Sequence, residues 1–282
     1  MKPESLSDRV RRLILGSLWS LKPPRLWGVP NILLLVTSYY LGFRRSDGAL
    51  PDPENALSDP DGLAGICPDL SVKTLYEGYK AGLFPLCHIQ PYKWWAPSTR
   101  MALRLTEFHM EKNLRRRLRS GHFTVTFDQA FEEVMRGCAE TRPGKLPLTW
   151  ITPDVIDAYS AMHEAGHAHS VEVWGEDGEL VGGVFGFAVG AVFFTESQFA
   201  RQRDASKVGF ATLVCHLQKW GFVLNDGKYF SNHLAQAGFE PVPRSQFNAL
   251  LKRYCATDLR VGHWSVDETL DVGNWDPKSG VN

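Results

Sequence analysis

The second half of the chain switches regularly between helical and strand-like spacing of its apolar residues. Residues 152–166 open with the triplet T-P-D, which favours a helix N-terminus, and end at Gly166, a residue typical of helix C-termini. Residues 168–199 alternate with period two and contain turn residues at 175–178 and around Gly190. This pattern predicts one helix followed by three consecutive antiparallel strands.

The same half ends with a helix over 205–221, a short strand over 222–226 and two short helices over 232–238 and 245–254. The order helix, three-stranded meander, helix, strand, helix and strand is typical of acetyltransferase-like (GNAT-type) domains. We therefore expect an α+β fold in which a mixed sheet carries helices on its faces.

The first half predicts shorter elements. Residues 71–82 form an amphipathic helix with Ser71 as N-cap, and residues 109–122 form a strongly basic helix that stops at Gly121. A strand over 123–127 follows. The next amphipathic helix begins with Asp128 as its expected N-cap.

Residues 1–48 differ from the rest in their pattern. An amphipathic segment with three arginines precedes the apolar run N-I-L-L-L-V-T-S-Y-Y-L-G-F, and that run, at about 13 residues, is shorter than the ~20 that span a bilayer. Two alternatives remain open: a helix packed on the domain behind it, or a segment lying on a membrane surface. The predicted organisation is an N-terminal extension over 1–48, a small domain over 49–105, a GNAT-like domain over 106–260 and a tail over 261–282.

Charge and cysteine content restrict the function classes. Lysine plus arginine equal aspartate plus glutamate at 31 each, so any contact with nucleic acid must come from a local basic patch. The five cysteines are scattered and contain no C-x-x-C pair, which fits reduced thiols in the cytoplasm. The N-terminus lacks the pattern of a secretory signal peptide. The sequence does not indicate an oligomeric state.

The segment H-E-A-G-H at 163–167 has the spacing of a zinc-peptidase motif. That site needs both histidines on one continuous helix, whereas Gly166 stands between them and period-two spacing follows at once. We therefore expect no metal site, with His163 and His167 at a helix end.

Several segments together resemble the leucyl/phenylalanyl-tRNA–protein transferases, which move an amino acid from its tRNA to the N-terminus of a protein that begins with Arg or Lys. The matching segments are Y-E-G-Y-K-A-G-L-F-P (76–85), K-W-W-A-P-S-T-R-M-A-L (93–103), the long run from T-W-I-T-P to S-V-E-V-W (149–174), E-L-V-G-G through T-E-S-Q-F (179–199), D-A-S-K (204–207) and N-H-L-A-Q-A-G-F-E-P-V-P-R (232–244). The resemblance covers about residues 50 to 255.

The resemblance implies how the tRNA binds. Trp94, Trp95 and Trp150 stand where the family stacks the 3′ adenosine, and stacking on an aromatic ring suits any base. The basic helix would contact acceptor-stem phosphates. Without the resemblance, the same run of basic residues would be interpreted as a solvated helix face. Its candidate residues are Lys112, Arg115, Arg116, Arg117 and Arg119.

The resemblance also implies catalytic roles. Glu196 would hold the amine, and Asp226 would assist proton transfer. The family has glutamine two positions after that aspartate, whereas this chain has Lys228, which can donate to an oxyanion or form an ion pair with Asp226.

The expected amino-acid pocket contains Phe194, Gln198 and Phe199, with Gln198 where the family has methionine. A buried amide there would disfavour a purely aliphatic guest. Two alternatives to Leu/Phe transfer therefore stay open: transfer of a different amino acid or to a different acceptor, and a repurposed homologue that binds tRNA or peptide. Acetyl-CoA chemistry is disfavoured because the segment before residue 205 lacks a glycine-rich phosphate loop. No cofactor is expected, because the aminoacyl ester already supplies the driving force.

Overall fold

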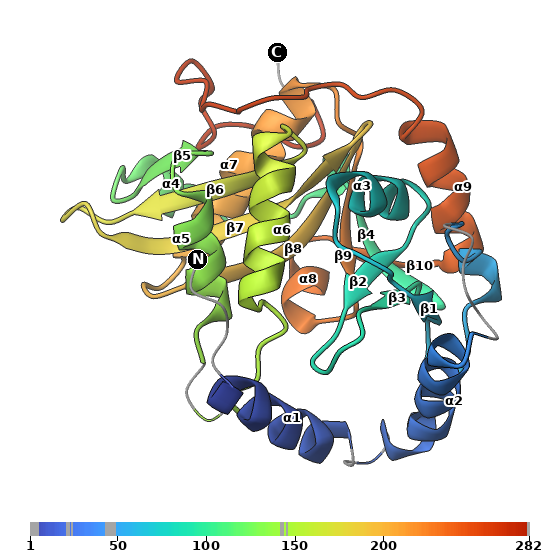
Figure 1. The fold of residues 1–282 in the computed structure, drawn as a ribbon. Helices are drawn as coiled ribbons and strands as arrows, with labels where there is room; N and C mark the ends of the chain where they lie inside the picture. The colour runs from blue at the N-terminus through green and yellow to red at the C-terminus, as the bar shows by residue number, and fades with distance from the viewer. Residues whose placement is uncertain are drawn as a thin grey trace.

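The computed structural model describes residues 6–20, 23, 25–42, 49–141, 144 and 146–280. A seven-stranded mixed sheet forms its centre, in the order β10-β4-β9-β8-β7-β6-β5 (Figure 1). Its strands are β4 (Thr99–Arg104), β5 (Thr124–Phe127), β6 (Ala168–Trp174), β7 (Leu180–Val189), β8 (Val192–Ala200), β9 (Leu224–Lys228) and β10 (Glu240–Pro243). All neighbours pair antiparallel except β8 and β9, which are parallel. The predicted α+β fold with a mixed sheet is confirmed.

A second, three-stranded antiparallel sheet lies beside the large one and has the order β1-β3-β2. Its strands are β1 (Leu63–Ile66), β2 (Phe84–Leu86) and β3 (Lys93–Trp95). The sequence placed residues 49–105 in one small domain, but β4 belongs to the large sheet, where it pairs with β9 and β10. The chain therefore passes from the small sheet to the large sheet between Trp95 and Thr99, before the predicted limit at residue 105.

The helices cover both faces of the large sheet (Figure 1). They are α1 (Leu6–Ser20), α2 (Val29–Tyr40), α3 (Val72–Lys80), α4 (Lys112–Arg119), α5 (Phe131–Ala139), α6 (Pro153–Glu164), α7 (Ala205–Lys219), α8 (Asn232–Gln236) and α9 (Arg244–Tyr254), with 3₁₀ turns at Arg25–Gly28, Pro53–Asn55 and Leu105–Glu107. Apolar residues of α3, α5, α6 and α9 form one core, and those of α4, α7 and the C-terminal segment form another. Strand β7 supplies both, with Phe185 and Phe187 on one face and Val184 and Ala188 on the other.

Helix capping agrees with the sequence at α6 but not at α5. Thr152 accepts a hydrogen bond from the N–H of Val155, as expected of its N-cap. Asp128 does not cap α5, which starts only at Phe131. The buried carboxylate of Glu172 on β6 instead accepts from the N–H groups at the start of α5, at 3.4 Å from Gln129 and 3.3 Å from Ala130. A tertiary contact thus replaces the local cap.

The N-terminal extension contributes α1 and α2, which lie at one end of the molecule beyond the small sheet (Figure 1). One side of each helix packs inward: a Cβ on Gly16 would approach Ile89, and one on Gly28 would approach Pro60. In the described part of the chain, no helix is both long and apolar enough to cross a bilayer. Parts of the 1–48 extension lie outside the described residues.

Candidate active site

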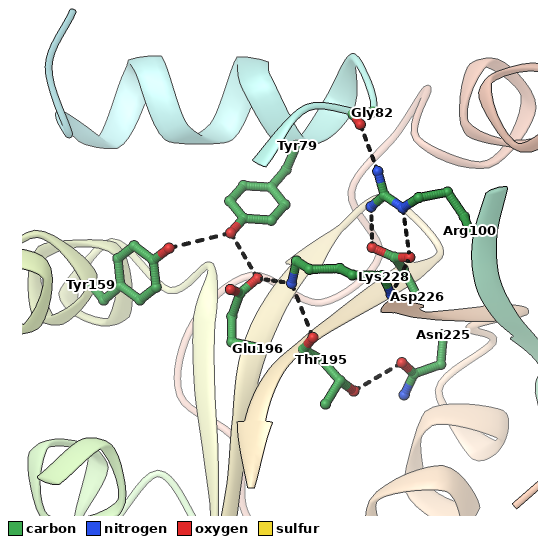
Figure 2. A network of polar contacts seen from close by, with 9 residues as sticks. All are labelled: Tyr79, Gly82, Arg100, Tyr159, Thr195, Glu196, Asn225, Asp226 and Lys228. Carbon is green, nitrogen blue, oxygen red and sulfur yellow. Dashed lines mark hydrogen bonds and ion pairs between the residues drawn. The ribbon is translucent and has the colours of Figure 1, made fainter. Parts of the chain in front are cut away.

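A network of polar side chains joins α3, α6 and the central strands β8 and β9 (Figure 2). At its centre, Glu196 of β8 accepts a hydrogen bond from the hydroxyl of Tyr79 at 2.7 Å and an ion-paired bond from the ammonium of Lys228. Both bonds go to the same carboxylate oxygen, Oε1. Tyr79 also lies 3.4 Å from the hydroxyl of Tyr159 on α6. The two tyrosines are completely buried.

Burial keeps these tyrosines protonated. Desolvation, followed by the nearby negative charge of Glu196, raises the pKa of Tyr79 well above its usual range. The same two causes raise the pKa of Tyr159. Tyr79 therefore remains a hydrogen-bond donor to Glu196 at physiological pH, and it holds the carboxylate in place.

Lys228 pairs with a different carboxylate from the one expected. It ends β9 with a positive φ of 61°, and its ammonium reaches Glu196 and the main-chain oxygen of Thr195, at 3.0 Å from the latter. The rings of Tyr79 and Phe84 lie beneath the ammonium at 5.6 and 5.4 Å. Of the two alternatives for Lys228, the ion pair with Asp226 is not formed, because the side chain turns toward β8 and pairs with Glu196. Lys228 contacts Asp226 only through its backbone N–H, which donates to the carboxylate at 3.0 Å.

Asp226 is fully buried and is occupied by Arg100 of β4. The guanidinium binds both carboxylate oxygens, and its third nitrogen donates to the main-chain oxygen of Gly82 at 2.8 Å. The rings of Phe84 and Phe247 lie 4.9 and 4.6 Å from the guanidinium carbon. This geometry argues against Asp226 as a general base, because a paired and enclosed carboxylate cannot reach a substrate proton.

A cleft with a volume of about 820 Å³ opens next to Glu196. Strands β8 and β9 pair only from Val192 to Phe194, and beyond that point β8 stays paired with β7 alone and forms one wall of the cleft. The other walls come from the end of α5 and from α8 with the turn before it. Gln198 and Phe199 line the cleft, whereas Phe194 does not, because it is buried beneath the sheet against Tyr79. The structure thus brings two of the three predicted pocket residues to one opening.

The three tryptophans do not form one stacking platform. Trp94 and Trp95 are neighbours on β3 and therefore point to opposite faces of the strand. Trp94 is fully buried in the hydrophobic core behind the small sheet, where its ring would contact a Cβ at Gly78. This burial contradicts its predicted stacking on an adenine. Trp95 is half-buried and donates to the main-chain oxygen of Leu86 at 2.9 Å. Trp150 is half-buried and lies 6.1 Å from the ring of Tyr159, which places it next to the polar network.

The basic helix α4 divides its arginines between two tasks. Arg115 and Arg119 donate hydrogen bonds to main-chain oxygens of the C-terminal segment, such as Gly273, at 3.0 to 3.2 Å. Arg117 lies over the ring of Phe123. Lys112 and Arg116 are exposed and remain the candidates for phosphate contact. Sequence alone could not separate the groups, because the anchored arginines meet residues more than 150 positions away.

The histidines of the H-E-x-x-H segment behave as expected of a helix end. Helix α6 ends at Glu164, and Gly166 has a φ of 80°, so His167 lies beyond the helix. The ring of His163 stacks on Phe131, and its Nδ1 donates to the main-chain oxygen of Ala168 at 2.8 Å.

Another group of possible ligands does converge among the described residues: atoms of Asp128, His163 and His263 lie within 4.8 Å of one another. Asp128 already accepts from the backbone N–H groups of Ser170 and Trp264, and it lies 2.8 Å from His169 Nδ1. These contacts make Asp128 a structural junction rather than an open ligand.

Sequence reasoning missed three members of the network. Tyr79 and Tyr159 stand at core positions of their helices, and Arg100 stands in a strand, so periodicity alone does not mark any of the three as a functional residue. The available signal was their position inside the segments that resemble the transferase family. A buried arginine also requires a carboxylate partner, and Asp226 is that partner.

Comparisons with known proteins show the family of this chain. The family model described as leucyl/phenylalanyl-tRNA protein transferase matches residues 102–252. The leucyl/phenylalanyl-tRNA–protein transferase of Stutzerimonas stutzeri is 46% identical over 205 residues, covering 72% of this chain and 90% of the relative. That of Thiobacillus denitrificans is 42% identical over 218 residues, covering 77% and 95%. The structure of FemX aligns with a TM-score of 0.39 and 13% identity over 60% of this chain and 61% of FemX, a likeness too low to carry an argument. The predicted family is confirmed: the chain belongs to the leucyl/phenylalanyl-tRNA–protein transferases, a family of aminoacyltransferases.

Proposed function

We propose that this chain transfers leucine, phenylalanine or another large amino acid from its tRNA to the N-terminal amine of proteins that begin with Arg or Lys, which tags them for degradation. The observation that carries this proposal is the Glu196 carboxylate, which Tyr79 holds in the lining of a cleft with 3% of its side chain exposed. A fixed carboxylate beside a cleft of this size suits a substrate that has an amine and a bulky side chain.

In the proposed step, the neutral amine of the acceptor attacks the ester carbonyl carbon of the aminoacyl-tRNA. The new C–N bond forms as the C–O bond to the ribose breaks, the amine loses a proton and the ribose oxygen gains one. Glu196 positions the amine through Oε2, since Oε1 already accepts from Tyr79 and Lys228. We assign Asp226 an indirect role, namely to hold Arg100 and the end of β9.

Lys228 fits this chemistry as a positive charge beside the amine site. A nearby like charge disfavours the protonated form of an incoming amine, and only the neutral amine is a nucleophile. Its ammonium can also donate a hydrogen bond to the oxygen that becomes negative in the tetrahedral intermediate. Lys228 would then take the place of the family's glutamine through the positive charge of its ammonium.

We further propose that the amino-acid side chain enters the cleft between Gln198 and Phe199, that Trp150 with Trp95 contacts the 3′ adenosine, and that Lys112 with Arg116 contacts acceptor-stem phosphates. The exposure of the two basic side chains and the position of Trp150 beside Tyr159 support these roles. The acetyltransferase-type (GNAT) fold is proposed for the large sheet, because β8 and β9 are parallel and diverge at the cleft. The small unit and the large unit remain the proposed domains, in the cytoplasm, where aminoacyl-tRNA is available.

A second candidate function is a repurposed homologue that binds tRNA or peptide without transfer. The ion pair of Lys228 with Glu196 favours it, because an occupied carboxylate has less affinity for a substrate amine.

One experiment separates the two. The purified chain is incubated with labelled Leu-tRNA, Phe-tRNA and a panel of other charged tRNAs, together with peptides that begin with Arg, Lys or Ser. Label in the Arg and Lys peptides supports transfer, and the donor that gives most label identifies the amino acid. Measurable tRNA binding without labelled peptide from any donor would instead support the repurposed homologue.

A further inference from the structure

Helix α1 has an apolar stripe on the side that faces away from the protein. Val10, Leu13, Ile14 and Leu18 follow the spacing of one helical face, and all are exposed, with Ile14 at 57%. The opposite side is the packed one, since Gly16 is buried against Ile89. The helix therefore directs its apolar face outward, contrary to the usual arrangement in a soluble domain.

The second helix, with the 3₁₀ turn before it, repeats this arrangement. Its inward side buries Leu35 and sets Gly28 against Pro60. Its outward residues recur in pairs at intervals of seven, and Trp27 is 74% exposed. The outward apolar residues are Leu26, Trp27, Leu33, Leu34, Tyr40 and Leu41. Helices α1 and α2 lie at the same end of the molecule (Figure 1). A monomer rarely leaves so much clustered apolar surface uncovered.

Charge concentrates in the same region. Residues 6–40 contain five basic residues and one acidic residue, although the whole chain has no net charge. Arg9, Arg11 and Arg25 are exposed beside the apolar stripes. Such a segment, apolar on one side with arginines at its edges and aromatic residues among its apolar ones, matches helices that lie in the plane of a membrane interface.

We propose that α1 and α2 form a lipid-binding face that attaches this aminoacyltransferase to a membrane containing anionic lipids. The helices have 15 and 12 residues, so they lie on the bilayer rather than cross it. A second copy of the chain is a poorer occupant, because a symmetric interface would bring two identical basic regions together. This attachment is independent of the proposed transfer reaction.

Flotation of the full chain with vesicles tests the proposal. The expected result is flotation with phosphatidylcholine vesicles that contain phosphatidylglycerol, and much weaker flotation with phosphatidylcholine alone. Arg11→Gln should lower the partition coefficient about five-fold, the effect of one basic residue near an anionic surface. Leu13→Ser together with Ile14→Ser should lower it by about a hundred-fold or more, since two buried apolar side chains are lost.

The matched control is Leu259→Ser, which removes an exposed leucine of the C-terminal segment and should leave flotation unchanged. Circular dichroism and thermal unfolding establish that each variant is folded, and peptide labelling in solution reports transfer separately from attachment. Absence of wild-type flotation with anionic vesicles overturns the proposal. A concentration-dependent dimer, seen by light scattering, that disappears in the Leu13/Ile14 variant without vesicle binding would overturn it in favour of a second copy.

Discussion

Substitution of Asp226 by asparagine distinguishes a structural carboxylate from a catalytic one. Asn at this position keeps the shape of the side chain but removes its charge, so the buried guanidinium of Arg100 loses its counter-ion. Removal of one member of a buried ion pair costs about 3 to 5 kcal/mol of folding free energy. With about 2 to 4 °C per kcal/mol for a domain of this size, the melting temperature should fall by roughly 6 to 20 °C.

The pair also joins two parts of the molecule, and this sets a second expectation. Arg100 binds Gly82 at the end of α3, so loss of the pair loosens the segment that positions Tyr79. Replacement of both partners by leucine removes the charges together and should recover part of the lost stability. Thermal unfolding followed by circular dichroism gives both values, and peptide labelling at a temperature where every variant is folded gives the transfer rate.

The two roles for Asp226 lead to opposite results. If the carboxylate only holds Arg100, the folded Asp226→Asn variant should lose less than a hundred-fold in kcat, whereas its melting temperature should fall strongly. A general base contributes about 10² to 10⁴ in rate. An Asp226→Asn variant that melts with the wild type and yet loses a hundred-fold or more in kcat would therefore refute the structural reading and restore Asp226 as the base.

Four further predictions follow from the described contacts. Lys228→Gln removes the positive charge beside the amine site, so the rising limb of kcat/KM against pH should move up by about one unit, and an unmoved profile would exclude this role. Glu196→Gln should lower kcat/KM about 10- to 100-fold, as expected for a lost charge-assisted hydrogen bond, and labelling kinetics that match the wild type would contradict it. Arg116→Ala should reduce the salt slope of tRNA binding by about one, measured by filter binding, with Arg104→Ala on the neighbouring element as the control. Burial lowers the pKa of His216, so this side chain binds more protons in the unfolded chain than in the folded one. The stability that the neutral side chain contributes is therefore lost as pH falls below about 6.5. A melting temperature that stays constant from about pH 8 to 5 would contradict this.

The elements of the chain were largely predictable because their signals are local. Thr152 caps α6, Gly166 ends it, and turn residues separate β6, β7 and β8, as their spacing indicated. The α5 cap was not predictable in this way, because Glu172 reaches it from a strand about 40 residues further along. Local capping rules describe only the contacts that a segment makes with itself.

The sequence named some residues of the candidate site but not the partners that they contact. The sequence by itself determined the order of helices and strands, because periodicity and caps act over a few residues, and its resemblance to the family singled out Glu196, Lys228 and Gln198. Only the tertiary structure decided that Lys228 forms an ion pair with Glu196 and that Arg100 forms one with Asp226, 126 positions away. It also decided that Trp94 is fully buried while Trp150 is only half-buried. The physical reason is that a buried charge takes the partner that packing brings within reach, and packing joins strands that are distant along the chain.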